Sequence, residues 1–125
     1  MVRLAQITPL VPVNDINRSV RFFVNTLGFR VGYQADSYVY LTRDCAAIRL
    51  ISTGEGVEVN HKKHQQACYI DVEDIDGLYQ KLEPELDELP RGRVKKLFNQ
   101  DYGQREFHVL DEDALLIMFG EPISQ

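Results

Sequence analysis

The chain has 125 residues, 44% of them hydrophobic and 26% charged, which suits one globular domain with one core. Its formal net charge of -5 at pH 7 disfavours nucleic acid as a partner, because binding phosphates requires a basic surface. The sequence contains no apolar signal segment and no run long enough to span a membrane, so we expect a cytoplasmic protein with no membrane partner.

The first segment predicts a strand followed by a helix. Residues 4–13 favour a strand, and Pro9 and Pro12 predict that it lies at a sheet edge or crosses to a partner, because proline cannot donate to the ladder. Asp15 can cap a helix in which apolar residues recur every three or four positions. Gly28 is placed to end this helix.

Three strands are expected next, at residues 29–34, 38–42 and 45–51, with a tight hairpin at Arg43-Asp44. Residues 52–66 are polar and predict a loop. Cys45 and Cys68 lie in apolar, strand-like segments, so we expect two buried free thiols in a reducing compartment.

The second half repeats this order of elements. A strand at residues 67–72 precedes a helix capped by Asp74, and Pro84 is expected to follow the end of that helix. Residues 85–96 are charged and predict an irregular excursion, before strands near 94–99, 104–110 and 115–120. We therefore expect a single domain of two similar modules, at about 1–53 and 66–121.

Several short motifs, in this order and spacing, resemble the vicinal oxygen chelate superfamily of glyoxalases, bleomycin resistance proteins and dioxygenases. The motifs are Pro9 six residues before Asp15-Ile16, Leu27-Gly28-Phe29, the helix start Val72-Glu73-Asp74-Ile75-Asp76-Gly77-Leu78-Tyr79, Tyr102-Gly103-Gln104-Arg105-Glu106-Phe107 and Asp111-x-Asp113. The chain is most similar to the bleomycin resistance proteins. One departure is Ala114, where the family has glycine after the second aspartate.

The resemblance implies an α+β fold in which two βαβββ modules form a curled mixed sheet around a cleft. It also implies a homodimer that exchanges its first strand around Pro9. The four positions at which enzymes of the superfamily hold a metal correspond to Thr8, Arg49, Ala67 and Met118. None is a usual ligand for a divalent ion, and the Arg49 cation would repel one, so we expect neither metal nor cofactor.

Two histidine patterns offer alternatives. His61 and His64 are three residues apart, but they stand in a cationic segment without a nearby acid, so a metal site there is disfavoured. Glu106 and His108 should share one strand face, where they could act as a general base or could simply form a polar pair in a wet cleft. We favour the polar pair.

Strand alternation and the resemblance together predict a ligand site lined by tyrosines and a few charges. Its expected residues are Tyr38, Arg49, Tyr69, Asp71, Tyr102, Glu106 and His108, with Arg49 opposite Asp71 and Glu106. The resemblance implies that Tyr38 and Tyr102 stack on a planar ligand. For Tyr40 and Tyr69, packing against a second subunit is an equally good interpretation.

These observations favour a metal-free protein that sequesters a planar, cationic, glycopeptide-like antibiotic of the bleomycin type without changing it. One alternative is an enzyme of the same superfamily, lyase or dioxygenase-like, that uses Glu106, His108 or Arg49. Another is a binding or regulatory domain for an unrelated metabolite.

Overall fold

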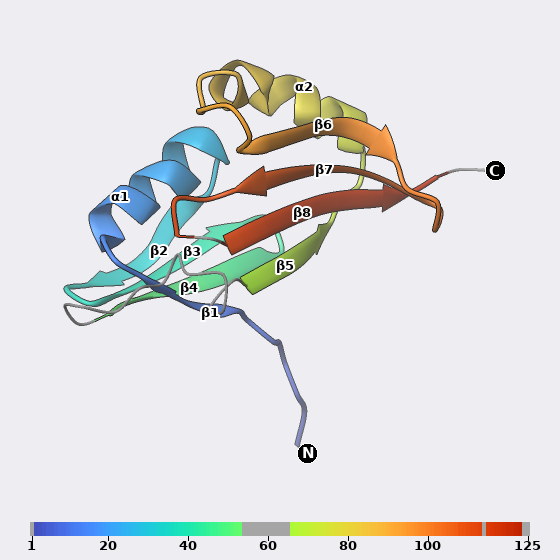
Figure 1. The fold of residues 1–125 in the computed structure, drawn as a ribbon. Coiled ribbons are helices and arrows are strands. Elements are labelled where there is room, and N and C mark those ends of the chain that lie inside the picture. Colours follow the sequence, from blue (N-terminus) through green and yellow to red (C-terminus); the bar gives the residue numbers. More distant parts are fainter. Residues whose placement is uncertain (1, 54–65, 114, 124–125) are drawn as a thin grey trace.

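The protein folds into two four-stranded mixed sheets, each with helical segments on one face (Figure 1). The structure is a computed structural model and describes residues 2–53, 66–113 and 115–123. The first half comprises β1 (Leu10–Val13), α1 (Ile16–Arg21), the π-helical turn η1 (Phe22–Thr26), β2 (Arg30–Ala35), β3 (Tyr38–Arg43) and β4 (Ala46–Ser52). The second half comprises β5 (Gln66–Asp71), α2 (Ile75–Leu86), β6 (Val94–Asn99), β7 (Gln104–Leu110) and β8 (Leu115–Pro122).

The two sheets have the same internal order. The strands run β1-β4-β3-β2 in the first sheet and β5-β8-β7-β6 in the second. In each, the first strand pairs in parallel with the last, and the other pairs are antiparallel. The repeat and the α+β fold class predicted from the sequence are thus confirmed, although the sheets remain separate and do not close around a cleft.

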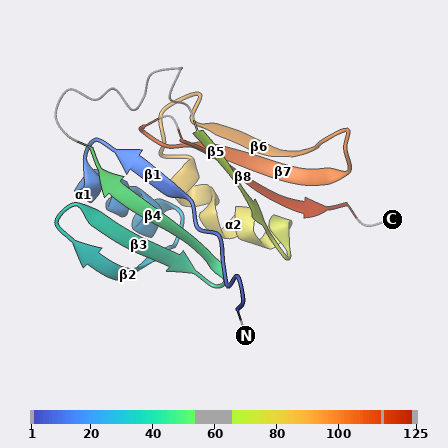
Figure 2. The ribbon, with the colours of Figure 1, turned by 90° about the horizontal axis from the view of Figure 1, so that it is seen from below.

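Apolar residues alternate along the central strands and bury one face of each sheet beneath its helix. In the second sheet Phe107 and Val109 are completely buried, and the Phe107 ring stacks on Phe119 with centroids 4.7 Å apart. Figure 2 views the molecule from below, with the sheets in front of the helices. The sheet faces turned away from the helices therefore remain open to a ligand or a partner.

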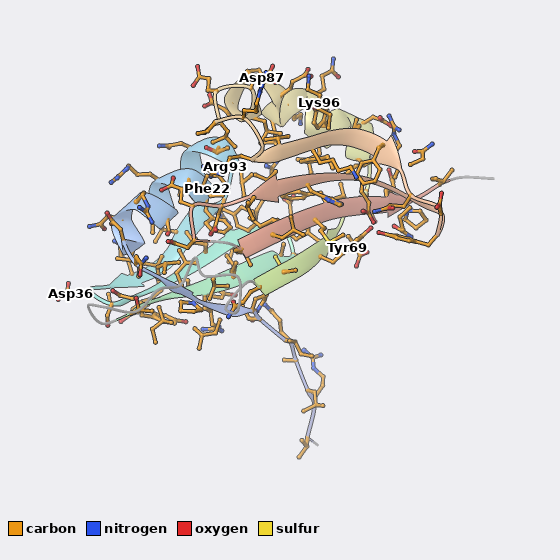
Figure 3. The ribbon with its side chains drawn as sticks, viewed as in Figure 1. Phe22, Asp36, Tyr69, Asp87, Arg93 and Lys96 are labelled. Atoms are coloured by element: carbon orange, nitrogen blue, oxygen red, sulfur yellow. The ribbon has the colours of Figure 1, made fainter. Side chains whose placement is uncertain are left out.

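Charged side chains join the two halves. Asp113, in the turn between β7 and β8, accepts a hydrogen bond from Arg18 Nη2 of α1 at 2.9 Å and another from Ser19 Oγ at 3.4 Å. The Arg93 guanidinium, which precedes β6, lies 5.5 Å from the centre of the Phe22 ring of η1 (Figure 3). Because both contacts cross from one half to the other, they fix the relative placement of the two sheets.

The expectation that Pro84 follows the second helix is wrong, because α2 continues to Leu86 with Pro84 inside it. Proline removes one backbone hydrogen bond, but the apolar stripe continues beyond it. Leu82 and Leu86 are both buried against the core and hold the helix together on either side of the proline. The irregular segment expected at residues 85–96 is correspondingly shorter.

The expectation of two buried thiols is wrong for Cys45, which is exposed, while Cys68 is partly buried; both are free. The hairpin turn lies one residue later than predicted, at Asp44 and Cys45, and β4 begins at Ala46. Asp44 adopts a left-handed conformation with φ of 52°, which short polar side chains tolerate in turns.

The N-terminal segment forms a shorter strand than predicted. Only Leu10–Val13 pairs with β4, at the edge of the first sheet, which agrees with the proline argument. Residues 2–9, called here the N-terminal arm, extend away from the body of the molecule (Figure 1). Its apolar residues Val2, Leu4 and Ile7 are each at least 96% exposed.

His61, His64 and Ala114 lie outside the described residues. Within the described part of the chain, no helix has the length and apolar character required to cross a membrane.

Candidate functional site

The second sheet carries a buried carboxylate, Glu106, on the face opposite α2. Glu106 is 0% exposed, and both of its oxygens accept two hydrogen bonds. Oε1 accepts from Gln100 Nε2 at 3.1 Å and from His108 Nε2 at 2.7 Å. Oε2 accepts from the hydroxyls of Tyr69 at 2.8 Å and Tyr102 at 2.7 Å. We call these five residues the Glu106 cluster.

Strand geometry explains why these side chains meet. Glu106 and His108 alternate with the buried Phe107 along β7, so both project from the open face. Glu106 pairs in register with Gly120 of β8, and Tyr69 reaches it from β5 across that glycine. A Cβ atom at Gly120 would lie only 1.8 Å from the Tyr69 hydroxyl, so glycine is required for this approach. Figure 3 shows Tyr69 beside β5 and β8.

The hydrogen bonds fix the charge of the cluster. Burial alone raises the pKa of Glu106, but the four donated hydrogen bonds outweigh it and lower the pKa to about 2. The pKa of Tyr69 is raised by its desolvation and then by donation to Glu106. The pKa of Tyr102 is raised mainly by donation to the same carboxylate. At neutral pH the cluster therefore holds an ionised carboxylate between two protonated tyrosines.

The cluster has both a buried side and an exposed side. Tyr102 is 60% exposed and Tyr69 39% exposed, although their hydroxyls point at a buried group. The His108 side chain is 13% exposed, and the edge of its ring meets the Phe98 ring at a centroid distance of 5.2 Å. Lys95 Nζ lies 4.0 Å from the centre of the Phe98 ring. The exposed surface consequently consists of aromatic rings held in place from below.

The first sheet presents a second aromatic group, built around Arg49. Its guanidinium lies 4.5 Å from the centre of the Tyr40 ring, and its Nη1 donates to the Tyr38 hydroxyl. The rings of Tyr33 and Tyr38 are 6.1 Å apart. The Arg49 side chain thus contacts tyrosines of its own sheet, whereas the sequence analysis predicted that it lies opposite Asp71 and Glu106.

Two hollows lie between the halves of the chain. One, of about 520 Å³, is bounded by the β3–β4 turn and the start of α2, and the other, of about 310 Å³, lies beside the N-terminal arm. Asp71 lines both hollows and Tyr69 lines the smaller one. Tyr38, Arg49 and the rest of the Glu106 cluster line neither. Within one chain, the predicted site residues therefore form separate groups.

The positions that correspond to superfamily metal ligands do not fit a divalent ion. Thr8 accepts a hydrogen bond from Gln6 in the N-terminal arm, Ala67 has no donor atom, and the Arg49 cation faces tyrosines. Met118 lies in register between Tyr69 and His108 and offers only a thioether. In residues 2–53, 66–113 and 115–123, no three His, Cys, Asp or Glu side chains come together as a possible metal site.

Sequence reasoning missed Gln100, Tyr33, Phe98 and Lys95. Gln100 is recognisable only once the turn from Gln100 to Gly103 is known, since that turn brings its amide back over β7. Tyr33 precedes Tyr38 by five residues across a hairpin, and strand pairing could have suggested their proximity.

Comparisons with known proteins agree with this architecture. A family model described as Glyoxalase/Bleomycin resistance protein/Dioxygenase superfamily matches residues 3–119. A bleomycin resistance protein of Geobacillus stearothermophilus is 29% identical over 134 residues, which cover 96% of this chain and 98% of the relative. A bleomycin resistance protein of Staphylococcus aureus has the same identity and coverage.

Solved structures show the same fold. A bleomycin-binding protein complexed with bleomycin has a TM-score of 0.77 at 17% identity, over 94% of this chain and 98% of that one. A bleomycin-binding protein from Streptomyces verticillus, complexed with copper(II)-bleomycin, has a TM-score of 0.76 at 21% identity, over all of both chains. A glyoxalase-related enzyme from Clostridium phytofermentans has a TM-score of 0.72 at 17% identity, over 98% of each chain.

Proposed function

The chain belongs to the glyoxalase, bleomycin resistance protein and dioxygenase superfamily, and we propose that within it this protein binds small molecules in the manner of a bleomycin resistance protein. The proposed ligand is a planar, cationic, glycopeptide-like antibiotic, which the protein sequesters in the cytoplasm without metal and without chemical change. Protection would then depend on affinity and stoichiometry alone. The similarity to named bleomycin resistance proteins over nearly the whole chain supports this ligand class.

The observation that carries the proposal is the exposed Tyr102 ring anchored on a buried carboxylate. An aromatic side chain that is 60% exposed ordinarily moves freely, but the hydroxyl of this one is held 2.7 Å from Glu106. A ring that is already fixed loses little conformational entropy when a planar ligand stacks on it. Tyrosine faces also attract cations, with each contact worth about 0.5–2 kcal/mol.

The enzyme alternative receives less support from the same cluster. A general base needs a free lone pair and a pKa near the working pH. Glu106 accepts four hydrogen bonds and its pKa is lowered to about 2, so it is a weak base. His108 is engaged with this carboxylate, and Arg49 with two tyrosines.

We further propose that the complete ligand site forms in a homodimer. The Arg49 group and the Glu106 cluster lie on the open faces of different sheets, and the two hollows within one chain do not join them. A second copy could place the first sheet of one chain against the second sheet of the other. The N-terminal arm supports this arrangement, because three almost fully exposed apolar residues next to Pro9 are suited to pairing with a partner.

Isothermal titration calorimetry of chelator-treated protein tests the function. Metal-free bleomycin should give saturable heat with a stoichiometry near one per chain, and divalent metals added without drug should give none. Stoichiometric metal binding together with no drug heat would overturn the proposal. If neither drug nor metal binds, a domain for an unrelated metabolite becomes the better explanation.

Two variants test the stacking surfaces. Tyr102→Ala and Tyr38→Ala should each weaken bleomycin binding about 2- to 30-fold, which corresponds to a contact of about 0.5–2 kcal/mol. Asp101→Ala is the matched control for Tyr102, because Asp101 is exposed on the same turn. Unchanged affinity in both tyrosine variants would remove the stacking surfaces from the proposal.

A further inference from the structure

Glu106 is too deeply buried and too fully bonded to touch a ligand, so its role must act through its neighbours. An ionised carboxylate can accept about four hydrogen bonds, and Glu106 already accepts four within the described residues. Three of these come from groups on the exposed side, namely Tyr69, Tyr102 and His108. What the carboxylate does to those three groups determines what a ligand meets.

Each tyrosine hydroxyl has a single proton, and the carboxylate receives it. Donation to an ionised oxygen is about twice as strong as donation to a neutral one. The amide oxygen of Gln104 lies 3.1 Å from the Tyr69 hydroxyl, but Glu106 is closer, at 2.8 Å, and charged. The hydroxyl oxygens of Tyr69 and Tyr102 can therefore only accept hydrogen bonds from a ligand.

Glu106 also holds the His108 ring. Its Nε2 lies 2.7 Å from Glu106 Oε1, so Nε2 carries the proton that this carboxylate receives. This hydrogen bond fixes the orientation of the ring. Lys95 of β6 pairs in register with His108 of β7, and its Nζ lies 4.0 Å from the centre of the Phe98 ring. The hydroxyl oxygens of the two tyrosines thus share one hydrogen-bonding polarity beside a fixed imidazole.

We propose that Glu106 is a positioning residue that fixes the His108 ring and makes the hydroxyls of Tyr69 and Tyr102 hydrogen-bond acceptors, so that this surface selects planar cations that donate hydrogen bonds and rejects planar anions. The inference rests on the proposed function, since it names the ligand chemistry of the same site. Amidinium and guanidinium groups match this surface, because they are flat, cationic and have several N–H donors. Ionised carboxylates and phosphates have only acceptor oxygens. They therefore cannot form hydrogen bonds with tyrosine oxygens that can themselves only accept.

A matched pair of probes tests the polarity without any antibiotic. Benzamidinium and benzoate have the same ring and opposite polarity. In NMR titrations at pH 7.5, benzamidinium should shift the ring signals of Tyr102 and His108 in a saturable way, and benzoate should not. Equal shifts with both probes, or shifts with benzoate alone, would overturn the proposal.

Glu106→Gln tests the positioning role through a spectroscopic signature. The amide oxygen can accept from the same two tyrosines but carries no charge, so it holds their protons about half as strongly as the carboxylate does. The ring ¹³Cζ signals of Tyr69 and Tyr102 should titrate closer to the ordinary tyrosine pKa of about 10 than they do in the wild type. An unchanged titration of both tyrosines would contradict a positioning role.

The affinity for benzamidinium should fall at least tenfold in Glu106→Gln and less in Glu106→Asp, which keeps the charge and both acceptor oxygens. Glu85→Gln removes the same charge from an exposed position on α2 and controls for net charge. If the Glu85 variant loses as much affinity as the Glu106 variant, general electrostatics and not positioning is responsible.

Tyr102→Phe provides a second test in case Glu106→Gln does not fold. Tyr102 is exposed on a turn, so this substitution should leave the fold intact. The ring remains but the accepting oxygen is lost, so the affinity for benzamidinium should fall about three- to tenfold, the contribution of one hydrogen bond. Unchanged affinity would show that only ring stacking matters. Failure of bleomycin to bind the wild type would refute the proposed function, whereas these probe and titration results would decide the polarity independently.

Discussion

Replacing Asp113 with asparagine tests the charged contact that joins the two halves of the chain. The Asp113 side chain is only 2% exposed and accepts from Arg18 Nη2 at 2.9 Å. Asparagine keeps the size and one acceptor oxygen, but it removes the negative charge. The variant therefore changes the strength of the contact without creating a cavity.

The expected cost follows from the type of hydrogen bond. A hydrogen bond to a charged group contributes about 1.5–3 kcal/mol and a neutral one about 0.5–1.5 kcal/mol. Asp113→Asn should therefore lower the free energy of unfolding by about 1–2 kcal/mol. Because the Arg18 side chain is 37% exposed, water can solvate its guanidinium when the charge opposite is lost, which keeps the cost below that of a fully buried pair.

Urea denaturation followed by circular dichroism measures this change. With a slope of about 1–3 kcal/mol per molar urea, the midpoint should fall by roughly 0.5–1 M. Glu112→Gln is the matched control, since Glu112 also pairs with Arg18 but its side chain is 33% exposed. Exposed pairs contribute about 0–1 kcal/mol, so this control should shift the midpoint less.

Measuring Asp113→Asn in the wild type and again in the Arg18→Ala variant isolates the contribution of the Arg18–Asp113 pair to stability. If Asp113 acts through Arg18, the cost of Asp113→Asn should shrink by more than 0.5 kcal/mol, a coupling typical of groups in contact, in the Arg18→Ala background. An equal cost in both backgrounds, or equal effects of the Asp113 and Glu112 variants, would refute the argument that this contact holds the halves together.

Four further outcomes are expected. Phe107→Ala should destabilise the fold by about 3–5 kcal/mol in the same urea assay, because it empties a fully buried ring position, and a loss below 1 kcal/mol would contradict the described core. Gly120→Ala should displace the Tyr69 hydroxyl from Glu106, and a tyrosine NMR titration that is unchanged for Tyr69 would oppose this. The lowered pKa of Glu106 contributes stability above about pH 4.5 that is lost as the pH falls towards 2, so Glu106→Gln should flatten the dependence of unfolding free energy on pH between about 2 and 4.5. Removing residues 2–8 should yield monomers by light scattering if the N-terminal arm joins two copies, and an unchanged mass would count against arm exchange.

The fold was largely predictable because its signals are local and repeated. Each half combines a capped helix with three strands of clear alternation, and the structure has the same order. The errors arose where packing outweighs local preference. Pro84 remains inside α2 because Leu82 and Leu86 are buried on both sides of it. The turn at Asp44 moves Cys45 out of the strand, since a left-handed residue reverses the chain there.

The candidate site was predictable only in part. Alternation along β7 placed Glu106 and His108 on the open face, as the structure has them. Sequence alone could not show that Glu106 is fully buried, because its partner Tyr69 is 37 positions away and reaches it across Gly120. Pairing of Arg49 with Tyr40 likewise depends on the register of β3 and β4. Such contacts depend on strand order, which composition and periodicity do not specify.

Native mass spectrometry of chelator-treated protein mixed with metal-free bleomycin tests the central claim most directly. One spectrum reports the oligomeric state, the number of bound molecules, any bound metal and the mass of the ligand released on activation. We predict a dimer with two molecules of bleomycin, no metal, and release of the drug at its unaltered mass. A released product of changed mass, or a complex that forms only when a divalent metal is bound to the protein, would contradict the claim of binding without metal or chemistry.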